Sequence, residues 1–543
     1  MKKNGFLEGA MISTICVVIC KVLGLIYVIP FYSIIGAQGG ALYSYAYSIY
    51  GIFLSLATSG IPIAMSKIIS EYHSLGYENL KQRAYNLGKY LITGIGILSF
   101  LILFIFAKNI AYLIIGDIKG GNTIEGVTFV IRIVSTALLF VPIYSVKKGF
   151  LQGQKYMTVP NIASVLEQLV RVIVIIGGSF LALKVFKLSL DTTVGLAVFG
   201  ATVGAIFAYM YITLKIKKNN LLTNTKATRE ESRTTNKDII KKIVFYALPF
   251  IVIDLIRSLY NMIDVFTVVK TLSKLGYSMA DAENIIGSIT TWASKLSSIV
   301  MSIVVGLTVS LVPNIMSSYV KKNYKDVDNK INLSLQLLLV TTIPMTVGLS
   351  FLSSPVWTMF YGNDILGINI FRIYIFTALT FTFYSILLDT TQTLNNTKIA
   401  IGTLILIFIL KGVLNVPIMY LCDFVNIKAY YGPIITTILT QLLAIIILLY
   451  YLKKKFNTSY TKSFVVLVKT MLCTSIMVVS LSIIKLFIPI TNLGRMTSLF
   501  VCILYAIIGF VIYFITGNKL HIFDSILNNE KMDNLLKKLH LKK

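Results

Sequence analysis

The stretch VPNIASVLEQLVRVIVIIGGSFLAL, residues 159–183, decides the class of fold. It is long enough to cross a bilayer, because a spanning helix needs about 20 predominantly apolar residues. Glu167 and Arg171 nevertheless lie roughly 12 and 18 Å from its start, at 1.5 Å per helical residue. A charged side chain near the bilayer centre costs roughly 2.5–3.5 kcal/mol. We therefore interpret the stretch as a membrane helix whose charges face a protein interior or a wet cavity.

The composition of the whole chain agrees with a membrane protein. Of its 543 residues, 56% are hydrophobic and 13% are charged, whereas soluble domains carry about 25% charged residues. The net charge of +28 would suit nucleic-acid binding, but the basic residues recur in short clusters between apolar runs. That distribution follows the positive-inside rule. We predict an all-α polytopic membrane protein with no nucleic-acid partner.

Apolar runs of spanning length recur along the chain, and we count fourteen. Each exceeds the roughly 20 residues that the hydrocarbon core requires. The first is expected to be retained, because it is long and lacks a small-residue cleavage site. The expected spans are 9–34, 41–66, 87–115, 124–146, 159–183, 193–214, 243–269, 284–312, 332–358, 367–392, 398–420, 430–452, 464–489 and 493–516.

Lysine and arginine gather in alternate loops, which predicts the orientation of the chain. The turn GAQGG after the first span and the loop 361–364 carry none, while Lys184, Lys187, Lys270 and Lys274 are exceptions to the pattern. We predict that both termini are cytoplasmic and that the protein lies in the cell membrane. The basic segments are 81–89, 147–155, 215–237, 321–330 and 453–455.

Residues 217–238, KKNNLLTNTKATREESRTTNKD, form one long polar linker. Six expected spans precede it, which predicts two six-helix lobes followed by two further helices. A weak internal repeat agrees, since the stretch 70–83 matches 317–330 at four positions with one constant offset. Transporters are often built from repeated halves with the site at their interface. The predicted domains are an N-lobe over 1–216, a cytoplasmic linker over 217–242, a C-lobe over 243–452, two spans within 453–518 and an amphipathic cytoplasmic tail over 519–543.

Charged residues from several spans share similar expected depths. Lys21 lies roughly 17 Å into the first span, and Lys295 roughly 15 Å into the eighth. In the seventh, the spacing of Asp254, Arg257 and Asp264 places them on one helical stripe. The candidate substrate-binding residues are Lys21, Arg171, Arg257 and Lys295, and the candidates for charge balance or ion coupling are Glu167, Asp254 and Asp264.

Two of these sets also have a purely structural interpretation. The pairs Glu167–Arg171 and Asp254–Arg257 have the spacing at which opposite charges neutralise each other on a helix. Lys21 and Lys295 have no acidic residue one turn away. A cavity with surplus positive charge suits an anion, and a diphosphate-linked lipid is an anion that a membrane offers. We expect the two lysines to contact the substrate, and the role of the Glu167–Arg171 pair stays open.

The chain lacks the motifs of common enzyme classes. No GxxxxGK[ST] loop occurs, so ATP is not the expected direct driver. Three histidines in expected loops and the tail cannot supply a catalytic triad, and five cysteines without a CxxC pair predict no metal site. We predict a transporter rather than an enzyme, without a cofactor, coupled to an ion gradient or to the membrane potential.

Three blocks carry a resemblance to a known family. Residues 21–76, KVLGLIYVIPFYSIIGAQGGALYSYAYSIYGIFLSLATSGIPIAMSKIISEYHSLG, resemble the start of bacterial polysaccharide-biosynthesis membrane proteins of the stage V sporulation protein B and YtgP type. Residues 149–171, GFLQGQKYMTVPNIASVLEQLVR, and 308–319, TVSLVPNIMSSY, are similar to further segments of that family. The resemblance covers the whole chain and implies the fold of the multidrug/oligosaccharidyl-lipid/polysaccharide superfamily, with a lipid-tail groove formed by the last two spans.

The chain is also similar to the MurJ-type lipid II flippases, which implies roles for two residues. Lys21 lies where those flippases carry a cavity arginine, and Lys295 lies within about a residue of the arginine in their eighth span. The chain departs from their pattern at 27–28, where relatives often carry another arginine. It departs again at 40–41, where they carry an acidic residue.

The resemblance implies a flippase that moves an undecaprenyl-diphosphate-linked precursor, lipid II, to the outer leaflet by alternating access. The alternatives are an exporter of another polysaccharide lipid, a cation-coupled drug antiporter on the same fold, and a membrane glycosyltransferase or polymerase. An antiporter needs an acid-dominated cavity, and a polymerase needs catalytic groups on large outer loops. We expect a monomer whose partners are the lipid-diphosphate and the bilayer. The sugar, the coupling ion and the vegetative or sporulation stage stay open.

Overall fold

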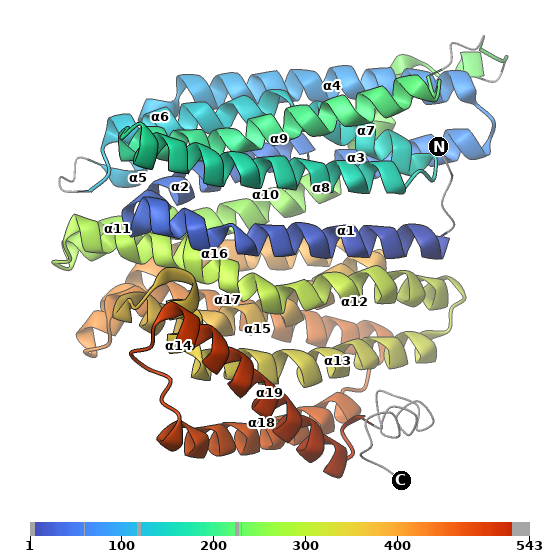
Figure 1. Cartoon of the computed structure of the whole chain (residues 1–543). Coiled ribbons are helices and arrows are strands. Elements are labelled where there is room, and N and C mark those ends of the chain that lie inside the picture. Colours follow the sequence, from blue (N-terminus) through green and yellow to red (C-terminus); the bar gives the residue numbers. More distant parts are fainter. Residues whose placement is uncertain (1–5, 59, 117–120, 223–226, 230, 524–543) are drawn as a thin grey trace. The chain divides into compact units, whose positions relative to one another are not determined.

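The described chain is built from helices. The computed structural model describes residues 6–58, 60–116, 121–222, 227–229 and 231–523, and these residues contain helices and turns but no strand (Figure 1). Most of the expected tail, from residue 524 onward, lies outside the described residues. The chain divides into two compact units, Met1–Thr291 and Trp292–Lys543. The prediction of an all-α fold is confirmed.

Unit 1 contains a bundle of long helices with several short ones. A 3-10 turn over Thr136–Leu139 precedes α7, and π-helical turns over Val174–Gly178 and Leu181–Val185 extend α8. The α-helices are α1 (Phe6–Ile26), α2 (Val28–Thr58), α3 (Ile61–Ser74), α4 (Glu78–Ile105), α5 (Ala107–Ile115), α6 (Ile124–Ser135), α7 (Val141–Gly153), α8 (Thr158–Ile173), α9 (Leu190–Lys218), α10 (Asn236–Lys274) and α11 (Met279–Gly287).

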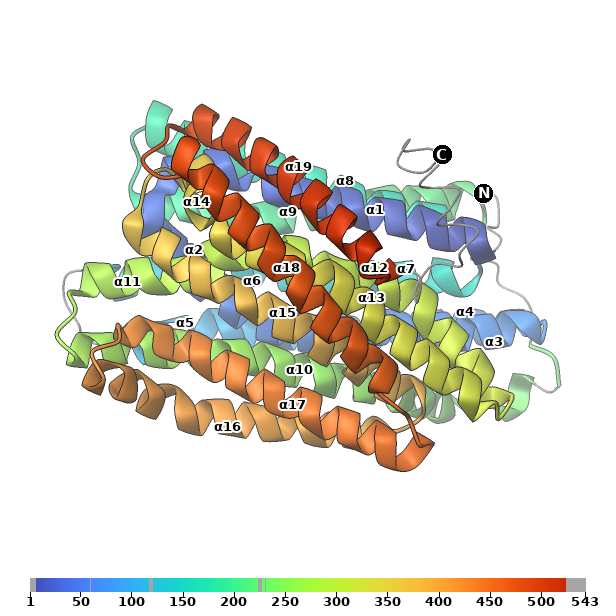
Figure 2. The ribbon, with the colours of Figure 1, turned by 90° about the horizontal axis from the view of Figure 1, so that it is seen from below.

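Unit 2 begins within a π-helical stretch over Ser288–Ala293, which joins α11 to α12. Its helices α16 and α17 pack side by side, and α19 lies beside α18 (Figure 2). The Tyr361 hydroxyl donates a hydrogen bond to the carbonyl of Trp292 at 3.0 Å. The α-helices are α12 (Ser294–Val320), α13 (Tyr324–Phe351), α14 (Ser353–Tyr361), α15 (Ile365–Thr393), α16 (Thr397–Phe424), α17 (Gly432–Phe456), α18 (Thr461–Phe487) and α19 (Arg495–Lys519).

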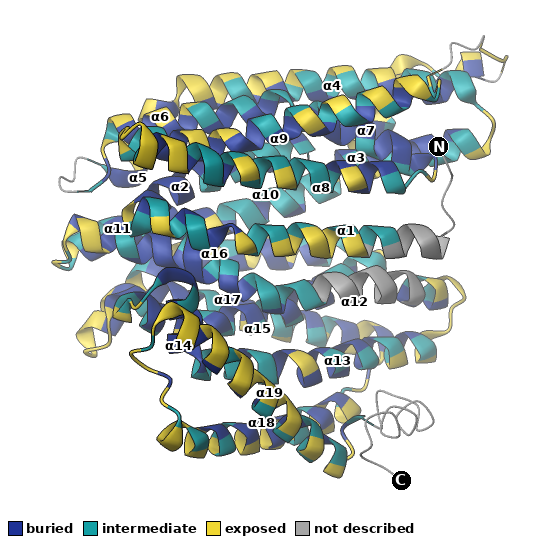
Figure 3. Ribbon diagram, viewed as in Figure 1, coloured by how far each residue is buried: buried dark blue, intermediate teal, exposed yellow. Residues whose placement is uncertain are grey.

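The helices have the length and surface of membrane spans. In the described part of the chain, eleven segments are long and apolar enough to cross a membrane. They coincide with the second to sixth and the ninth to fourteenth expected spans; the remaining three are helical in α1, α10 and α12. Exposed positions follow one another along α4 and α18 (Figure 3). They include large apolar residues such as Leu98 and Val479, which suit contact with lipid. The chain is a multi-pass membrane protein, and the count of fourteen spans stays a prediction.

The expected turn GAQGG is made inside α2. Gly36 has φ 65° and ψ −167°, which interrupts the helix between its first two turns and its long remainder. A positive φ of this kind is readily available only to glycine. The chain therefore changes direction at one residue, without an extended loop.

The polar linker is attached to unit 1. Glu231 is 2% exposed, and its carboxylate accepts hydrogen bonds from the backbone N–H groups of Asn79 at 2.9 Å and Leu80 at 3.2 Å. These donors lie in the first turn of α4, where backbone N–H groups have no partner within the helix. Arg83 of α4 donates to Asn236 Oδ1 at 2.7 Å. The start of α10 is therefore fixed beside the start of α4.

Further contacts hold α10 in unit 1. Lys242 of α10 forms an ion pair with Glu71 of α3 at 2.6 Å. Gly60, at φ 73°, lies so close to α10 that a Cβ there would be 2.4 Å from the Ala247 carbonyl oxygen. By contacts, α10 and α11 thus belong to the first unit. The predicted lobes, 1–216 and 243–452, are defined as repeated halves of the sequence and not by contacts. They stay a prediction.

Candidate functional site

The charged pair on α8 is formed as its spacing predicts. Arg171 Nη2 donates a hydrogen bond to Glu167 Oε1 at 2.6 Å, and the two side chains are 23% and 18% exposed. The Nε atom of Arg171 is buried without a hydrogen-bond partner among the described residues. Arg171 therefore still has an N–H donor that the ion pair does not use.

A second cation, Lys148 of α7, belongs to the same cluster. Lys148 Nζ donates to Ser164 Oγ at 2.8 Å and lies 5.3 Å from the centre of the Tyr144 ring. It also interacts electrostatically with Glu167. Because two cations face one carboxylate, the cluster has a net positive charge. Sequence reasoning placed Lys148 in a basic loop and missed it as a candidate site residue.

Tyrosines of α2 adjoin this cluster. The rings of Tyr43 and Tyr47 lie 4.4 Å apart, and those of Tyr47 and Tyr50 lie 5.9 Å apart. Their spacing of three and four residues places them on one face of the helix. All three interact electrostatically with Arg171. The cationic cluster of α7 and α8 is therefore bordered by phenol rings.

The backbone at the charged pair is fixed by α9. Gly200 and Gly204 have the G-x-x-x-G spacing that lets membrane helices approach closely. A Cβ at Gly204 would lie 2.6 Å from the Glu167 carbonyl oxygen, and one at Gly200 would lie 3.1 Å from that of Arg171. Each glycine therefore faces the peptide group of one charged residue.

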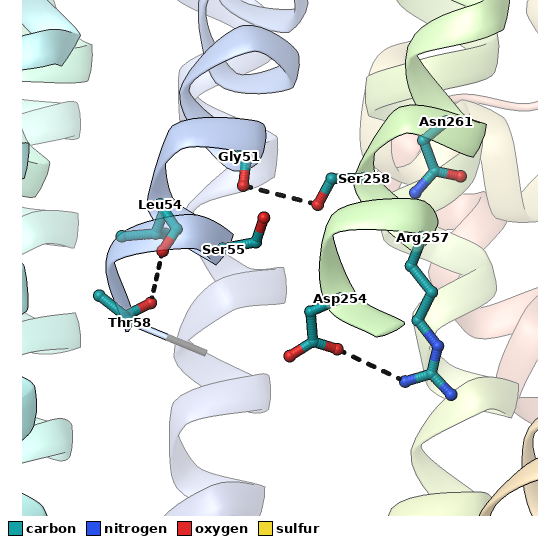
Figure 4. Close-up of a pocket in the computed structure, with 8 residues that line it drawn as sticks. All are labelled: Gly51, Leu54, Ser55, Thr58, Asp254, Arg257, Ser258 and Asn261. Carbon is teal, nitrogen blue, oxygen red and sulfur yellow. Dashed lines mark hydrogen bonds and ion pairs between the residues drawn. The ribbon is translucent and has the colours of Figure 1, made fainter. Parts of the chain in front are cut away.

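A pocket of about 250 Å³ lies between α2 and α10. Figure 4 shows Asp254 and Arg257 pointing toward each other beside it, with Asn261 farther along the same helix. Arg257 Nη1 lies 3.8 Å from Asp254 Oδ1. Ser258 Oγ donates to the Gly51 carbonyl at 3.5 Å. The residues lining the pocket are Gly51, Leu54, Ser55, Thr58, Asp254, Arg257, Ser258 and Asn261.

The other predicted site residues are distributed over both units. Lys21 is exposed on α1, and Asp264 is 8% exposed on α10 beyond the pocket lining, both in unit 1. Lys295 is half-buried at the start of α12 in unit 2. Lys21 and Lys295 both have interaction partners in the structure. The convergence of the seven predicted residues on one cavity stays a prediction.

Unit 2 contains a buried cation that sequence reasoning missed. Lys411 of α16 is 1% exposed, and Asn415, one turn later, is fully buried. On the adjoining helices, Thr380 Oγ1 donates to Gln441 Oε1 at 2.5 Å. The signal in the sequence is a lone lysine in the apolar run LILIFILKGVLNVP, residues 404–417.

Within the described ranges, no group of three or more His, Cys, Asp or Glu side chains is arranged to hold a metal ion. The five cysteines are free thiols. The candidate site therefore consists of cations, carboxylates, hydroxyls and phenol rings, which can bind an anion by charge and hydrogen bonds.

Comparison with known proteins supplies the family. Residues 6–320 match the family described as polysaccharide biosynthesis protein. The chain belongs to this family. The chain is 32% identical over 532 residues to "Lipid II flippase MurJ" of Bacillus subtilis (strain 168), with 96% of each chain covered. It is 24% identical over 373 residues to "Stage V sporulation protein B" of the same organism, with 67% of this chain and 68% of that protein covered.

Solved structures agree with the fold of this family. A structure of "Lipid II flippase MurJ, inward closed conformation" has a TM-score of 0.68 at 16% identity, covering 94% of this chain and 99% of that one. An inward-facing MATE transporter of the MOP superfamily has a TM-score of 0.60 at 14% identity, covering 83% and 99%. The predicted resemblance and MATE/MurJ-like fold are confirmed. The relative at 32% identity is a flippase, and the prediction of a transporter rather than an enzyme is confirmed as well.

Proposed function

We propose that this protein is a flippase that moves an undecaprenyl-diphosphate-linked cell-wall precursor, lipid II, from the cytoplasmic to the outer leaflet. The observation that carries this proposal is the 32% identity to a lipid II flippase over 96% of both chains. Similarity over nearly the full length includes the helices that hold every predicted site residue. The protein would lie in the plasma membrane as a monomer with both termini in the cytoplasm.

The chemistry of the site supports an anionic headgroup. In unit 1, Lys148 and Arg171 face the single carboxylate of Glu167, so the cluster retains a positive charge. A diphosphate offers oxygen acceptors to both cations, and charge-assisted hydrogen bonds of this kind are roughly twice as strong as neutral ones. We assign Lys21, Arg171, Arg257 and Lys295 to the substrate, and Glu167, Asp254 and Asp264 to charge balance or ion coupling.

Alternating access by rocking of two repeated halves would carry the headgroup across. The membrane potential can contribute, because one charge moved through 100 mV changes the free energy by about 2.3 kcal/mol. The partners are then the lipid-diphosphate and the surrounding bilayer, and no cofactor takes part.

A cation-coupled drug antiporter is the second candidate, because MATE transporters share the fold. It would need a surplus of carboxylates around its substrate. The cluster on α7 and α8 has the opposite balance, with two cations and one carboxylate. An exporter of another polysaccharide lipid would also bind an anionic headgroup. The assay distinguishes it from a lipid II flippase by which of the supplied lipids is transported.

The test is transport by the purified full-length chain in liposomes that contain labelled lipid II. We expect Lys21→Ala and Lys295→Ala each to lower the initial rate at least tenfold, which corresponds to about 1.4 kcal/mol. Lys485→Ala, an exposed lysine on α18, is the matched control and should leave the rate unchanged. Normal rates in both cavity variants would overturn the assignment. Export of a cationic dye without lipid II movement would establish the antiporter.

The role of the Glu167–Arg171 pair is tested by exchanging its charges in the double variant Glu167→Arg, Arg171→Glu. The exchange preserves the ion pair one turn apart. If Arg171 also contacts the diphosphate, the variant folds but transports at least tenfold more slowly. Full transport by the exchanged pair would show that it is only a structural strut.

A further inference from the structure

A buried carboxyl group outside the proposed substrate site, that of Glu283, lies on α11. Glu283 is 0% exposed, and its carboxyl oxygens accept the backbone N–H of Asn122 at 3.1 and 2.9 Å. Asn122 Nδ2 donates to Glu283 Oε2 at 3.0 Å and to the Gln38 carbonyl at 3.3 Å. One carboxyl group thus joins α11, the segment before α6 and the early part of α2.

Close packing surrounds this junction on both sides. A Cβ at Gly121 would lie 2.5 Å from Glu283 Oε2. A Cβ at Gly287, one turn after Glu283, would lie 3.0 Å from the Ala41 backbone nitrogen of α2. The close approach at Gly121 and the hydrogen bonds from Asn122 therefore tie the segment 121–122 to the Glu283 side chain.

No cation balances Glu283 among the described residues. Lys270 donates to a backbone carbonyl of α5, Lys274 is exposed, and Asp281 is bonded to the serine that caps its own helix. An ionised carboxylate buried without a counter-ion is costly, and such a group tends to take up a proton. Charged or titratable residues toward this end of the neighbouring elements include Tyr43 and Tyr45 of α2, Glu125 of α6, Asp264, Lys270 and Lys274 of α10, and Asp281 of α11.

The surroundings can satisfy the neutral acid. A protonated carboxyl group has one O–H donor and keeps acceptor capacity, so Oε2 can accept both Asn122 donors while Oε1 carries the proton. The buried Tyr45 hydroxyl lies beside the Glu283 carboxyl group and interacts with it. It offers an acceptor for that proton. Burial raises the pKa of Glu283 to about 7, although the hydrogen bonds from Asn122 and the Tyr45 hydroxyl oppose the shift.

Helix α11, which carries Glu283, lies at the end of unit 1 opposite the start of α4 (Figure 1). Asp281, two residues earlier, is exposed and accepts a hydrogen bond from Ser278 at 2.6 Å. An exposed carboxylate facing lipid would be costly, so we expect this turn to lie beyond the hydrocarbon core. The distribution of lysine and arginine predicts that this end faces the outside of the cell.

We propose that Glu283 is a proton-binding site that keeps the outer end of unit 1 closed in its neutral form and releases the 121–122 segment when it ionises. The direction follows from linkage. The closed state binds the proton more tightly than an open state in which Glu283 is hydrated, so protonation favours closure and loss of the proton favours opening. A proton taken from the outer side would thus close this end after substrate release.

The test is hydrogen–deuterium exchange of the full-length protein in lipid nanodiscs at about pH 6 and about pH 8.5, one to two units from the pKa on either side. Exchange times are normalised to the intrinsic amide rate at each pH. We expect the peptide covering 121–128 to lose protection roughly tenfold at the higher pH, as the open state becomes populated. The peptide covering 79–86 lies at the other end of unit 1, where Glu231 accepts hydrogen bonds from its backbone. This peptide should be equally protected at both pH values.

Two variants are expected to act in opposite directions. Glu283→Gln, which mimics the neutral acid, should keep 121–128 protected at both pH values. Gly121→Ala, whose Cβ meets Glu283, should leave the segment unprotected at both. Asp281→Asn, on the exposed side of the same helix turn, is the matched control and should behave like the wild type. Equal protection of the wild type at both pH values, or a wild-type profile in either Glu283→Gln or Gly121→Ala, would overturn the proposal.

The consequence for transport rests on the proposed function and is measured separately. In the lipid II assay, Glu283→Gln should slow transport at least fivefold, because its outer end stays closed. If the wild type moves no lipid II, the proposed function fails, while the exchange data still decide whether Glu283 is the proton site. If transport occurs and Glu283→Gln matches the wild type, closure by this site is not part of the cycle.

Discussion

Two buried carboxyl groups at opposite ends of unit 1 differ in what surrounds them. Desolvation acts to raise the pKa of Glu231, but hydrogen bonds from the backbone N–H groups of Thr228, Leu80 and Asn79 outweigh it and hold the pKa below its usual value. Glu283 receives N–H groups from one residue only, and burial dominates. The same side chain therefore serves as a permanent helix cap at one end and as a titrating group at the other.

The first prediction concerns Glu231→Gln, which should lower the free energy of unfolding by about 1–3 kcal/mol near pH 7. Because the pKa of Glu231 is lowered in the folded state, its stabilisation is present above the usual value of 4.5 and is lost as the pH falls through the folded-state pKa. The difference from wild type should therefore shrink on acidification. Thermal unfolding of the purified protein across this range measures it.

Glu125→Gln, an exposed carboxylate in the first turn of α6, is the control for that experiment and should change stability by less than about 0.5 kcal/mol. A Glu231→Gln variant as stable as this control would contradict the assignment of Glu231 as the cap of α4.

Single residues of the site could be predicted from sequence where spacing pairs them. Glu167 and Arg171 stand one turn apart, and the structure joins them at 2.6 Å. Lys148 could not be found, because the sequence does not show that α7 continues to Gly153 and carries it to Ser164. Glu283 lies one residue outside an expected span, and its burial depends on Asn122, distant in sequence.

At the scale of helices, the packing of α8 on α9 decides how the charged pair is presented. Gly200 and Gly204 bring α9 against the peptide groups of Arg171 and Glu167. Side chains on α8 can point at a ligand reproducibly only if this backbone is fixed.

The second prediction is that Gly204→Ala destabilises the protein by about 1–3 kcal/mol, because its Cβ would overpack the interface. It should also lower transport, since α8 must move away from its position. Gly402→Ala on α16, where a Cβ meets nothing within 4 Å, is the matched control and should be neutral or stabilising by up to about 1 kcal/mol. Thermal unfolding and the lipid II assay measure both effects, and equal behaviour of the two variants would contradict the packing role.

Hydropathy predicts where helices lie better than where they break. The expected spans coincide with helices, but α2 continues over GAQGG with a break at Gly36, and α8 passes into π-helical turns after Ile173. Such breaks depend on single backbone angles and on neighbouring helices, which a window of apolar residues averages out.

At the scale of the molecule, the linker marks a boundary in sequence that is not the boundary in contacts. The ion pair of Lys242 with Glu71, the close approach at Gly60 and the anchoring of Glu231 bind α10 to unit 1. None of these contacts is visible in the composition of the linker, because each joins residues far apart in the chain. The two stretches of the weak repeat nevertheless both form a helix, a turn and a helix, in α3–α4 and α12–α13.

The third prediction concerns the topology. A reporter enzyme active only outside the cytoplasm should be active when fused after Gly276 or Gly362, and inactive after Lys155 or Lys322. Lysine and arginine near the last two sites hold them in the cytoplasm. The activities of the two groups should differ at least about tenfold. If the fusions after Gly276 and Lys322 were both active or both inactive, the chain would not cross the membrane between them. The eighth expected span would then be wrong, and so would the count of fourteen.

The π-helical stretch over Ser288–Ala293 includes the point at which the two units meet in the chain, between Thr291 and Trp292. A π turn contains more residues than an α turn. Rewinding it by one residue would rotate the helix that follows by about 100° and shift it by about 1.5 Å. Lys295 lies two residues beyond this stretch, whereas Glu283 lies before it. The Tyr361 hydroxyl donates a hydrogen bond to the Trp292 carbonyl within this stretch, so a rewinding that turned Lys295 would have to break this bond or move α14 with it.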